Sequence, residues 1–478
     1  MNSKANLLKV FNDQFLYDGS LGETYLLGKD VVNVIKEIAN SSWESLNILD
    51  EEELSVAQKI VIKERDRGRF IGEPFKGVDY PSLNELFCTD ISQMTLIVTE
   101  QCNLRCSYCP YSTESTDLYR SHRDKKMTRE TADMSIKYFL DNVKDGSGIG
   151  YYGGEPFLNF DIIKYVTNKV KTNLKEQKII FSVTSNLNVF SKEIAKFLVE
   201  NNFILVVSLD GPQEVHDCNR RSHNGKGTFS NLMKNLDFLK ENYPEFYKNN
   251  VLTNTVLAPP FEFEKIDDFF SGFDTKLLFS RFSLASDANN DFYPDRGTNI
   301  NEAADQVFNW VMKKMYDLII NKQAVESSPL LKGVLQQYVQ ILKSPHVAAN
   351  DKKLPFKSCI PGSKLAVNVD GSLSICERCE SLKIGDIENG IDIEYTKQLV
   401  NEWVAFMQGK CSGCWAALYC KCCYITAWDG EKFNQDRQKT FCENTKKSVE
   451  RWLNLYLPIK KLNPHFFDFI NEDEEQFL

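Results

Sequence analysis

The stretch TEQCNLRCSYCPYS, residues 99–112, contains three cysteines in the spacing C-x3-C-x2-C, and Tyr108 directly precedes the last of them. Three thiolates can bind three corners of a cubane iron–sulfur cluster, because each iron takes one protein ligand and the fourth iron stays open for a small molecule. Zinc is the alternative, since it also binds C-x2-C pairs. A structural zinc site needs four closed ligands, however, and no fourth candidate lies nearby in the sequence. The stretch therefore favours an iron–sulfur site with one open iron.

Six short runs typical of β-strands follow one another between about residue 92 and residue 300. They cover residues 94–100, 148–154, 179–186, 204–211, 251–259 and 276–285. Amphipathic stretches such as RETADMSIKYFLDNV and SKEIAKFLVENN separate them, so we expect parallel strands joined by crossover helices. Such folds collect ligands at the carboxyl ends of their strands. Polar and glycine-rich groups stand at those ends here, namely TEQC, GGEP, TSN and SLDG.

The three-cysteine stretch and these strand-end motifs resemble those of the radical S-adenosylmethionine (radical SAM) enzymes. YYGGEP at 151–156, TSN at 184–186 and SLDGPQEVHDCNRR from Ser208 onward are similar to the family's second, third and fourth strand motifs. The resemblance covers about residues 92–300 and implies an α/β fold, a partial (β/α)6 TIM-like barrel. It also implies that a [4Fe-4S] cluster and S-adenosylmethionine (SAM) bind together. In that family a 5′-deoxyadenosyl radical then takes a hydrogen atom from the substrate.

The resemblance assigns a role to individual residues. Cys102, Cys106 and Cys109 would hold the cluster and are the expected catalytic and metal-binding residues. The expected SAM-binding residues are Tyr108 near the adenine, Gly153, Gly154 and Glu155 at the methionine group, and Ser185, Ser208 and Arg220. Glycines allow a ligand to approach the backbone closely, and a carboxylate can receive the ammonium of SAM. Arg221 is an alternative to Arg220 for the carboxylate of the ligand.

Nine of the 14 cysteines lie between Cys359 and Cys442, which suggests a second metal-binding region. The order Cys359-x11-Gly371-x4-Cys376, followed by a C-x2-C-x5-C group and a distant cysteine, is similar to the SPASM extension of radical SAM enzymes. That extension binds two further [4Fe-4S] clusters. The resemblance assigns the second auxiliary cluster to Cys411, Cys414, Cys420 and Cys442, and part of the first to Cys359, Cys376 and Cys423.

Two points of this cysteine pattern stay open. The first auxiliary cluster is either one ligand short, with an open iron, or completed by Cys379 or Cys422. A zinc ribbon formed by CSGC and CKCC is the alternative to the whole arrangement. Disulfides are disfavoured, because we expect a reducing, cytoplasmic environment.

Composition and charge bear on partners and location. A formal net charge of -9 and the lack of a long Lys/Arg run argue against nucleic acid as a partner. The N-terminal residues do not follow a signal-peptide pattern, and no stretch of 18 apolar residues occurs. We therefore expect a cytoplasmic protein without a membrane partner.

Residues 1–82 are expected to form a separate small module. LLKVFNDQFLYD and GETYLL predict two strands around a turn near residues 19–22, followed by a helix at 29–40 and a charged helix at about 51–69. In size and in its β-then-α order the module resembles the winged-helix-like leader-binding domain, or RiPP recognition element, of radical SAM peptide maturases. A stabilising cap is the alternative. The remaining expected divisions are the barrel at 92–300, a helical bridge at 301–355, the SPASM domain at 356–450 and a tail at 451–478.

These resemblances together imply a RiPP maturase of the sactipeptide or ranthipeptide type, which joins a precursor cysteine sulfur to a carbon as a thioether. The implied partners are a ribosomal precursor peptide with its leader, and an external one-electron donor of the flavodoxin or ferredoxin type. Carbon–carbon crosslinking, epimerisation and formylglycine formation in a sulfatase are alternatives within the same chemistry. A multi-cluster electron carrier would need the cysteines but not GGEP and SLDG at strand ends.

Overall fold

The computed structural model describes most of the chain as two compact units, and each is treated separately below. The described residues are 8–12, 14–18, 23–40, 52–67, 91–112, 121–174, 177–273, 281–286, 292–321, 323–343, 359, 361–411 and 413–469. One unit consists of residues 1–86, 338–359 and 397–478, and the other of residues 87–337 and 360–396. Within the described ranges no helix combines the length and the apolar character needed to cross a membrane.

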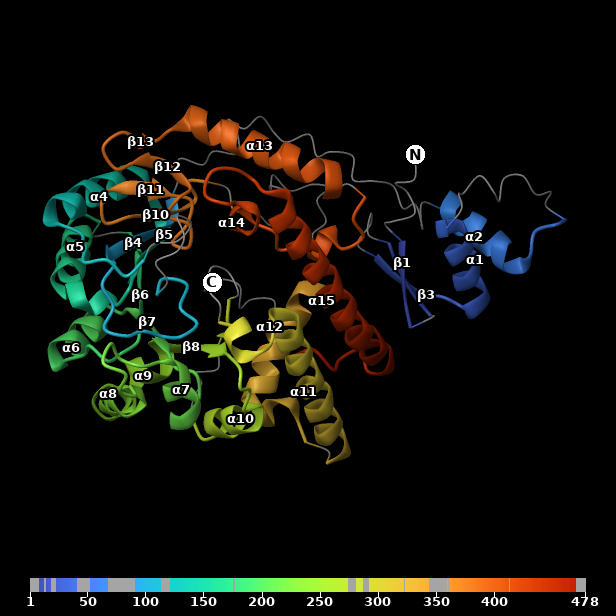
Figure 1. Cartoon of the computed structure of the whole chain (residues 1–478), viewed down its shortest axis with the longest axis horizontal. Coiled ribbons are helices and arrows are strands. Elements are labelled where there is room, and N and C mark those ends of the chain that lie inside the picture. Colours follow the sequence, from blue (N-terminus) through green and yellow to red (C-terminus); the bar gives the residue numbers. More distant parts are fainter. Residues whose placement is uncertain are drawn as a thin grey trace. The chain divides into compact units, whose positions relative to one another are not determined.

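A ten-stranded sheet forms the centre of the second unit, with the order β13-β12-β11-β10-β4-β5-β6-β7-β8-β9 (Figure 1). Six neighbouring strands that pair in parallel in chain order are β4 (Ile91–Thr99), β5 (Val143–Gly153), β6 (Ile180–Ser185), β7 (Ile204–Ser208), β8 (Val251–Leu257) and β9 (Arg281–Leu284). Each of the six runs expected from the sequence falls on one of these strands. The predicted α/β fold with a partial (β/α)6 barrel is therefore confirmed.

The crossover helices follow the amphipathic stretches of the sequence. They include α4 (Arg129–Asn142), α5 (Phe160–Asn173), α6 (Lys192–Glu200), α7 (Gln213–Asn219), α8 (Phe229–Asn242) and α10 (Phe263–Ser271). The side chain of Ser191 caps α6 by accepting a hydrogen bond from the backbone N–H of Ile194, as expected for an N-cap serine. Along α5, Ile163, Val166 and Val170 are buried at helical spacing, and each such side chain contributes about 1.5–3 kcal/mol when fully buried.

Four further strands continue this sheet beyond β4, which the sequence did not predict. β10 (Lys364–Val367) pairs in parallel with β4, and the antiparallel strands β11 (Ser372–Ser374), β12 (Lys383–Asp386) and β13 (Gly390–Ile391) follow it. Gly371 closes the β10–β11 turn with a φ of +84°, and a Cβ there would lie 2.9 Å from Cδ1 of Ile387. Residues 360–396 thus belong to the same compact unit as the barrel strands. The domain limits drawn from the sequence stay predictions.

The first unit contains the N-terminal module. Its sheet has the order β1-β2-β3, formed by β1 (Leu8–Phe11), β2 (Phe15–Asp18) and β3 (Glu23–Leu26), and α1 (Lys29–Asn40) and α2 (Val56–Asp66) follow. The expectation of one strand over residues 7–18 was wrong, because Asn12 adopts a φ of +50° and turns the chain into the β1–β2 hairpin. Both expected helices are present. The expected turn near residues 19–22 lies outside the described residues.

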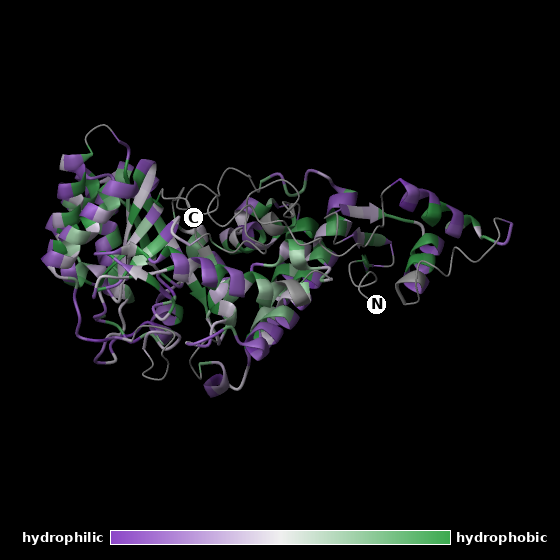
Figure 2. Cartoon of the chain, turned by 90° about the horizontal axis from the view of Figure 1, so that it is seen from above, coloured by the Kyte–Doolittle hydropathy of each residue, from purple (hydrophilic) through white to green (hydrophobic). Residues whose placement is uncertain are grey.

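The same unit holds the C-terminal helices α13 (Ile393–Cys411), α14 (Tyr424–Ala427) and α15 (Gln435–Leu462). α13 spans the division between the units, which falls at residue 397. Between the barrel and these helices in sequence, α11 (Ile300–Ile320) and α12 (Pro329–Lys343) occupy much of the region expected to be a helical bridge. Figure 2 shows that most helices are hydrophobic on one side and hydrophilic on the other. The acidic end of the chain, residues 470–478, lies outside the described residues.

Candidate active site

The three cysteines of the opening stretch lie in the loop that follows β4. Cys106 is buried, and Cys102 and Cys109 are half-buried. The loop is fixed to the segment after α7, because the backbone N–H of Arg105 donates to the carbonyl of Arg221 (2.8 Å) and that of Ser107 to the carbonyl of Asn219 (3.0 Å). These hydrogen bonds join the cysteine motif to the segment that follows the SLDG motif, although the two are far apart in the sequence.

The thiols of this triplet are held close enough to influence one another. The pKa of Cys102 and of Cys106 is raised to about 12, chiefly by burial and in part by the other thiols of the triplet. Two groups act in the opposite direction. The backbone N–H of Leu104 lies 3.4 Å from Sγ of Cys102, and the guanidinium of Arg220 lowers the pKa of Cys106. Buried, mutually close thiols beside hydrogen-bond donors fit a metal cluster, since binding replaces their protons.

The GGEP motif contacts the segment that leads into Cys102. The backbone N–H groups of Gly154 and Glu155 donate to the carbonyls of Thr99 (2.9 Å) and Gln101 (2.8 Å). A Cβ on Gly153 would lie 2.0 Å from the carbonyl oxygen of Thr99, and one on Gly154 would lie 2.1 Å from that of Gln101. The glycines are thus required by the close approach of β5 to the chain before the cysteines. Their contact with SAM stays a prediction.

Glu155 is fully buried, and the TSN motif surrounds it. The hydroxyl of Ser185 donates to Oε1 of Glu155 at 2.9 Å, and the backbone N–H groups of Phe157 and Asn186 donate at 3.2 and 2.8 Å. Burial raises the pKa of Glu155 to about 7, while these three donors act to lower it. Gly153, Ser185 and Ser208 are the last residues of β5, β6 and β7, so three of the predicted SAM-binding residues share the carboxyl edge of the sheet.

Arg220 belongs to a buried ionic group beneath the cysteine loop. Its Nε lies 2.9 Å from Oδ2 of Asp210, and the hydroxyl of Tyr108 donates to the same oxygen. The guanidinium carbon lies 5.4 Å from the centre of the Tyr108 ring. Arg221 differs from its neighbour, because it is exposed and donates to the backbone carbonyls of Asp217 and Gly225. Of the two arginines, Arg220 is the one beside the cysteines.

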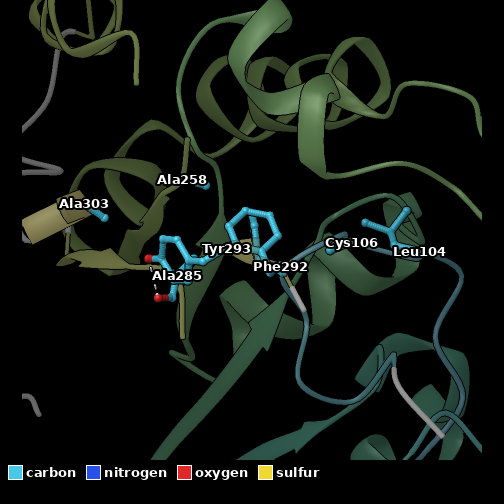
Figure 3. Packing of buried hydrophobic residues seen from close by; sticks show 8 residues of the cluster. Leu104, Cys106, Ala258, Ala285, Phe292, Tyr293 and Ala303 are labelled. Atoms are coloured by element: carbon cyan, nitrogen blue, oxygen red, sulfur yellow. Dashed lines mark hydrogen bonds between the residues drawn. The ribbon is translucent and has the colours of Figure 1, made fainter. Parts of the chain in front are cut away.

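The sequence analysis did not identify the residues that pack against this loop from the other side. Leu104, Cys106 and Tyr108 share a buried cluster with residues of the segment 285–303, including Phe292 and Tyr293 (Figure 3). The rings of Tyr108 and Phe292 meet edge to face with centroids 5.9 Å apart. The hydroxyl of Tyr293 donates to the carbonyl of Ala285 at 2.8 Å. Only aromatic content marks this segment in the sequence, and its contact with the loop is long-range.

The predicted ligands of the first auxiliary cluster are divided between the two units. Cys376 and Cys379 lie in the loop between β11 and β12, and the backbone N–H of Cys379 donates to the carbonyl of Cys376. Cys359, which is exposed, and Cys423, which is half-buried, belong to the other unit. Their assignment as one ligand set stays a prediction. In the alternative set, the Sγ of Cys422 lies 3.1 Å from Oγ1 of Thr426.

The four cysteines assigned to the second auxiliary cluster line one cavity in the first unit. Cys411 ends α13, Cys414 and Cys420 flank the next loop, and Cys442 and Lys446 lie one turn apart on α15. Burial raises the pKa of Cys411 and of Cys414, and the Lys446 ammonium opposes this at both thiols. Four thiols beside one cavity are the set of ligands that a [4Fe-4S] cluster requires. The assignment of these cysteines to a second auxiliary cluster stays a prediction.

No group of three or more His, Cys, Asp or Glu side chains in the described part of the chain is arranged to hold a metal ion. A cubane cluster requires its ligands to be farther apart than a single metal ion does, because each thiolate binds a different iron.

Comparison with known proteins defines the class of the barrel. Residues 96–271 match the model of the radical SAM superfamily. The described fold is similar to that of the solved structure "Native anSMEcpe with bound AdoMet", with a TM-score of 0.58 and 19% identity, over 80% of this chain and all of that one. The chain therefore contains a radical SAM domain, and Cys102, Cys106 and Cys109 lie within the matched residues. Their role as ligands of a [4Fe-4S] cluster stays a prediction.

Two curated relatives align with part of the chain. The chain is 28% identical over 308 residues to a cysteine-type anaerobic sulfatase-maturating enzyme of Clostridium novyi, which covers 62% of this chain and 77% of that enzyme. It is also 28% identical over 214 residues to the radical SAM cyclopropyl synthase TigE of Paramaledivibacter caminithermalis, which covers 43% of each chain. The alignment thus spans less than half of the second relative.

Proposed function

We propose that this chain is a radical SAM maturase that joins a cysteine sulfur of a ribosomally made precursor peptide to a carbon, forming a thioether. The observation that carries the proposal is the cavity lined by Cys411, Cys414, Cys420 and Cys442 in a chain that already has the radical SAM triplet. Thioether formation releases one electron after the hydrogen atom has been abstracted, and a second iron–sulfur site could accept that electron.

The residues of the barrel would position SAM and exclude water. The cysteine triplet would hold the cluster, Arg220 would stabilise the thiolate of Cys106, and Glu155 would receive the ammonium of SAM. The cluster and SAM would supply a carbon radical able to take a hydrogen atom from the peptide. A cluster held by Cys411, Cys414, Cys420 and Cys442 would supply an acceptor for the electron released when the substrate thiol loses its proton and its sulfur bonds to that carbon. The buried aromatic cluster around Tyr108 keeps solvent from the loop.

A peptide substrate is supported by the N-terminal module. In the sheet order β1-β2-β3, β3 is one of the two edge strands among the described strands. The N–H of Leu27 donates to the carbonyl of Gln14, so by alternation along the ladder Thr24 and Leu26 direct their N–H groups away from β2. An extended leader peptide can pair with such an edge and be held near the enzyme.

The leader hypothesis is tested with Thr24→Pro, which removes one outward N–H and keeps the β2–β3 ladder. We expect leader affinity to fall at least about tenfold, a change of about 1.4 kcal/mol, with SAM cleavage unchanged. Thr24→Val is the matched control and should bind normally. Equal binding by the two variants, measured by fluorescence anisotropy of a labelled leader, would remove this support.

The iron content tests the three-cluster hypothesis. Reconstituted protein should hold about twelve irons, and replacing the triplet by alanine should remove roughly four of them together with SAM cleavage. Cys411→Ala should remove roughly four others while the triplet still cleaves SAM. Cys218→Ala is the control, because Cys218 is exposed and outside both sets. A total near four irons in the wild-type protein would refute the auxiliary clusters.

Formylglycine formation is the second candidate, and the similarity to sulfatase-maturating enzymes supports it. Mass spectrometry after anaerobic incubation separates the two. A thioether product loses two hydrogens per crosslink and its cysteine no longer reacts with iodoacetamide. A formylglycine product instead carries an aldehyde that reacts with a hydrazine probe. Activity on a sulfatase peptide alone would favour the second candidate.

A further inference from the structure

The loop after β6, residues 186–188, contains a residue in a strained backbone conformation. Leu187 adopts a φ of +54°. Only three non-glycine residues in the described part of the chain have a positive φ, and the other two are the asparagines Asn12 and Asn202, a residue type that tolerates this region. A leucine keeps such a conformation only where the surrounding structure holds it there. The partners of Leu187 therefore indicate which elements fix this loop.

Side chains from β6 and α8 hold Leu187 in this conformation. Its backbone N–H donates to the hydroxyl of Ser185 at 2.8 Å, and its carbonyl accepts from the side-chain amide of Asn235 at 2.8 Å. Asn231, one turn earlier on α8, donates to the carbonyl of Asn188 at 3.0 Å. The Leu187 side chain is fully buried. Helix α8 therefore binds two successive carbonyls of the turn that the left-handed residue makes.

The same turn fixes the orientation of Asn186. The backbone N–H of Asn188 donates to Oδ1 of Asn186 at 2.9 Å, so the oxygen and nitrogen of that side-chain amide cannot exchange places. Its Nδ2 donates to Oδ1 of Asn103 at 2.9 Å, and its backbone N–H donates to Oε2 of Glu155 at 2.8 Å. Asn103 directly follows Cys102 in the chain. Asn186 thus joins the buried carboxylate of Glu155 to the cysteine loop.

We propose that Asn235 is a positioning residue of the SAM site. By holding the carbonyl of Leu187, it keeps Asn186 directed at Glu155 and at the cysteine loop, and so sets the position of the carboxylate relative to that loop. The proposal rests on the proposed function, in which Glu155 receives the ammonium of SAM and Cys102 binds the cluster. SAM must reach both groups at once, so a small shift of one against the other weakens its binding. Asn235 acts through the loop after β6 and needs no contact with SAM.

The opposite edge of the same sheet offers a matched control. Asn202 has a φ of +51°, and the side-chain amide of Asn250 donates to its Oδ1 at 3.0 Å and to the carbonyl of Phe203 at 2.9 Å. These residues directly precede β7 and β8, at the amino ends of the strands. Asn250→Leu therefore removes the same kind of hydrogen bond as Asn235→Leu, at the edge of the sheet that does not carry the cysteine loop.

Hydrogen exchange in metal-free, full-length protein without SAM tests whether Asn235 holds the loop. Asn235→Leu should raise the exchange rate of amides 186–188 several-fold in mass spectrometry, because the loop opens more easily without this bond. Asn231→Leu, which loses an exposed contact, should give a smaller increase. Asn250→Leu should leave amides 186–188 unchanged and raise the exchange at 202–203 instead. Unchanged exchange at 186–188 in Asn235→Leu and Asn231→Leu would overturn the proposal.

SAM binding by the reconstituted full-length protein tests the positioning role. In anaerobic isothermal titration calorimetry, Asn235→Leu should weaken SAM binding about tenfold. Asn250→Leu should stay within about twofold of the wild-type affinity, although its unfolding midpoint falls by a similar amount. Wild-type affinity in Asn235→Leu, or equal weakening in both variants, would overturn the positioning role. Wild-type protein that does not bind SAM would instead refute the proposed function, while the exchange rates would still report the hold of α8 on the loop.

Discussion

Nη2 of Arg123 lies 2.8 Å from both carboxylate oxygens of Glu380, the residue after Cys379. Its Nε lies 2.7 Å from Oε2 of Glu100, which is buried two residues before Cys102. One guanidinium therefore joins the loop of the radical SAM cysteines to the loop of the predicted first auxiliary cluster, and both loops belong to the same compact unit.

Replacing Arg123 by methionine should leave the buried carboxylate of Glu100 without its cation. We expect a loss of about 1–3 kcal/mol in the free energy of unfolding, because the cost of an unsatisfied buried group is then not offset. Chemical denaturation measures it. Lys196→Met is the control, since its pair with Glu200 on α6 is exposed and should contribute at most about 0.5 kcal/mol. Equal losses in both variants would contradict the structural role of Arg123.

Gly153→Ala should be far more harmful than Gly146→Ala, although both glycines have positive φ. The φ values of +143° and +81° cost each alanine about 1–3 kcal/mol. At Gly146 nothing lies within 4 Å of the added Cβ, whereas at Gly153 it meets the Thr99 carbonyl. We expect Gly153→Ala to lose the iron of the triplet as well as stability. Similar unfolding midpoints and iron contents would contradict the steric argument.

Substitutions of the two adjacent arginines should differ sharply in their effects on stability and on SAM binding. Arg220→Met leaves Asp210 buried without its cation, so we expect a loss of about 3–5 kcal/mol and weak SAM binding. Arg221→Met removes only exposed contacts to backbone carbonyls and should bind SAM normally in isothermal titration calorimetry. Weakened SAM binding by Arg221→Met alone would reverse the assignment.

His216 should make the protein acid-sensitive. Its Nδ1 accepts from the N–H of Asp210 at 3.4 Å, and Nε2 lies 3.1 Å from Oγ1 of Thr228, whose own proton goes to the carbonyl of Arg220. These partners fit the neutral ring, and burial lowers the pKa of His216 to about 4. Its stabilising contribution is thus complete above the unfolded value of about 6.5 and is lost as the pH falls toward 4.

Between pH 7 and pH 5 this single group should lower the free energy of unfolding by about 2 kcal/mol. Denaturation of wild-type protein and of His216→Gln at the two pH values measures it, and the variant should show a correspondingly smaller difference. His465→Gln is the control, because that histidine is exposed. An equal pH dependence in wild-type protein and His216→Gln would show that other groups dominate.

The sequence predicted those features that depend on local pattern. Short β-rich runs that alternate with amphipathic stretches placed the six strands, and the motifs at their ends brought Gly153, Ser185 and Ser208 to one edge of the sheet. It did not predict the pairing of β10 with β4, because strand partners 271 residues apart in the chain leave no local signal. The partners of Arg123 and the packing of Phe11 on Trp415 were missed for the same reason. Asn12 was read through as part of a strand, although an asparagine followed by an aspartate is a common turn sequence.

The pairing of β10 with β4 determines where this chain can be joined to the C-terminal region of a relative. Lys364 and Leu365 lie beside Gln93 and Met94 of the strand that leads to Cys102, and the carbonyl of Ser363 accepts from the Ser92 amide and hydroxyl. A chimera joined near residue 356 would give this strand a partner strand from another protein, and a poor match between the two would leave an open sheet edge beside the cysteine loop. A junction after residue 396 keeps the sheet whole. The second chimera should express as soluble, SAM-cleaving protein, and the first should aggregate.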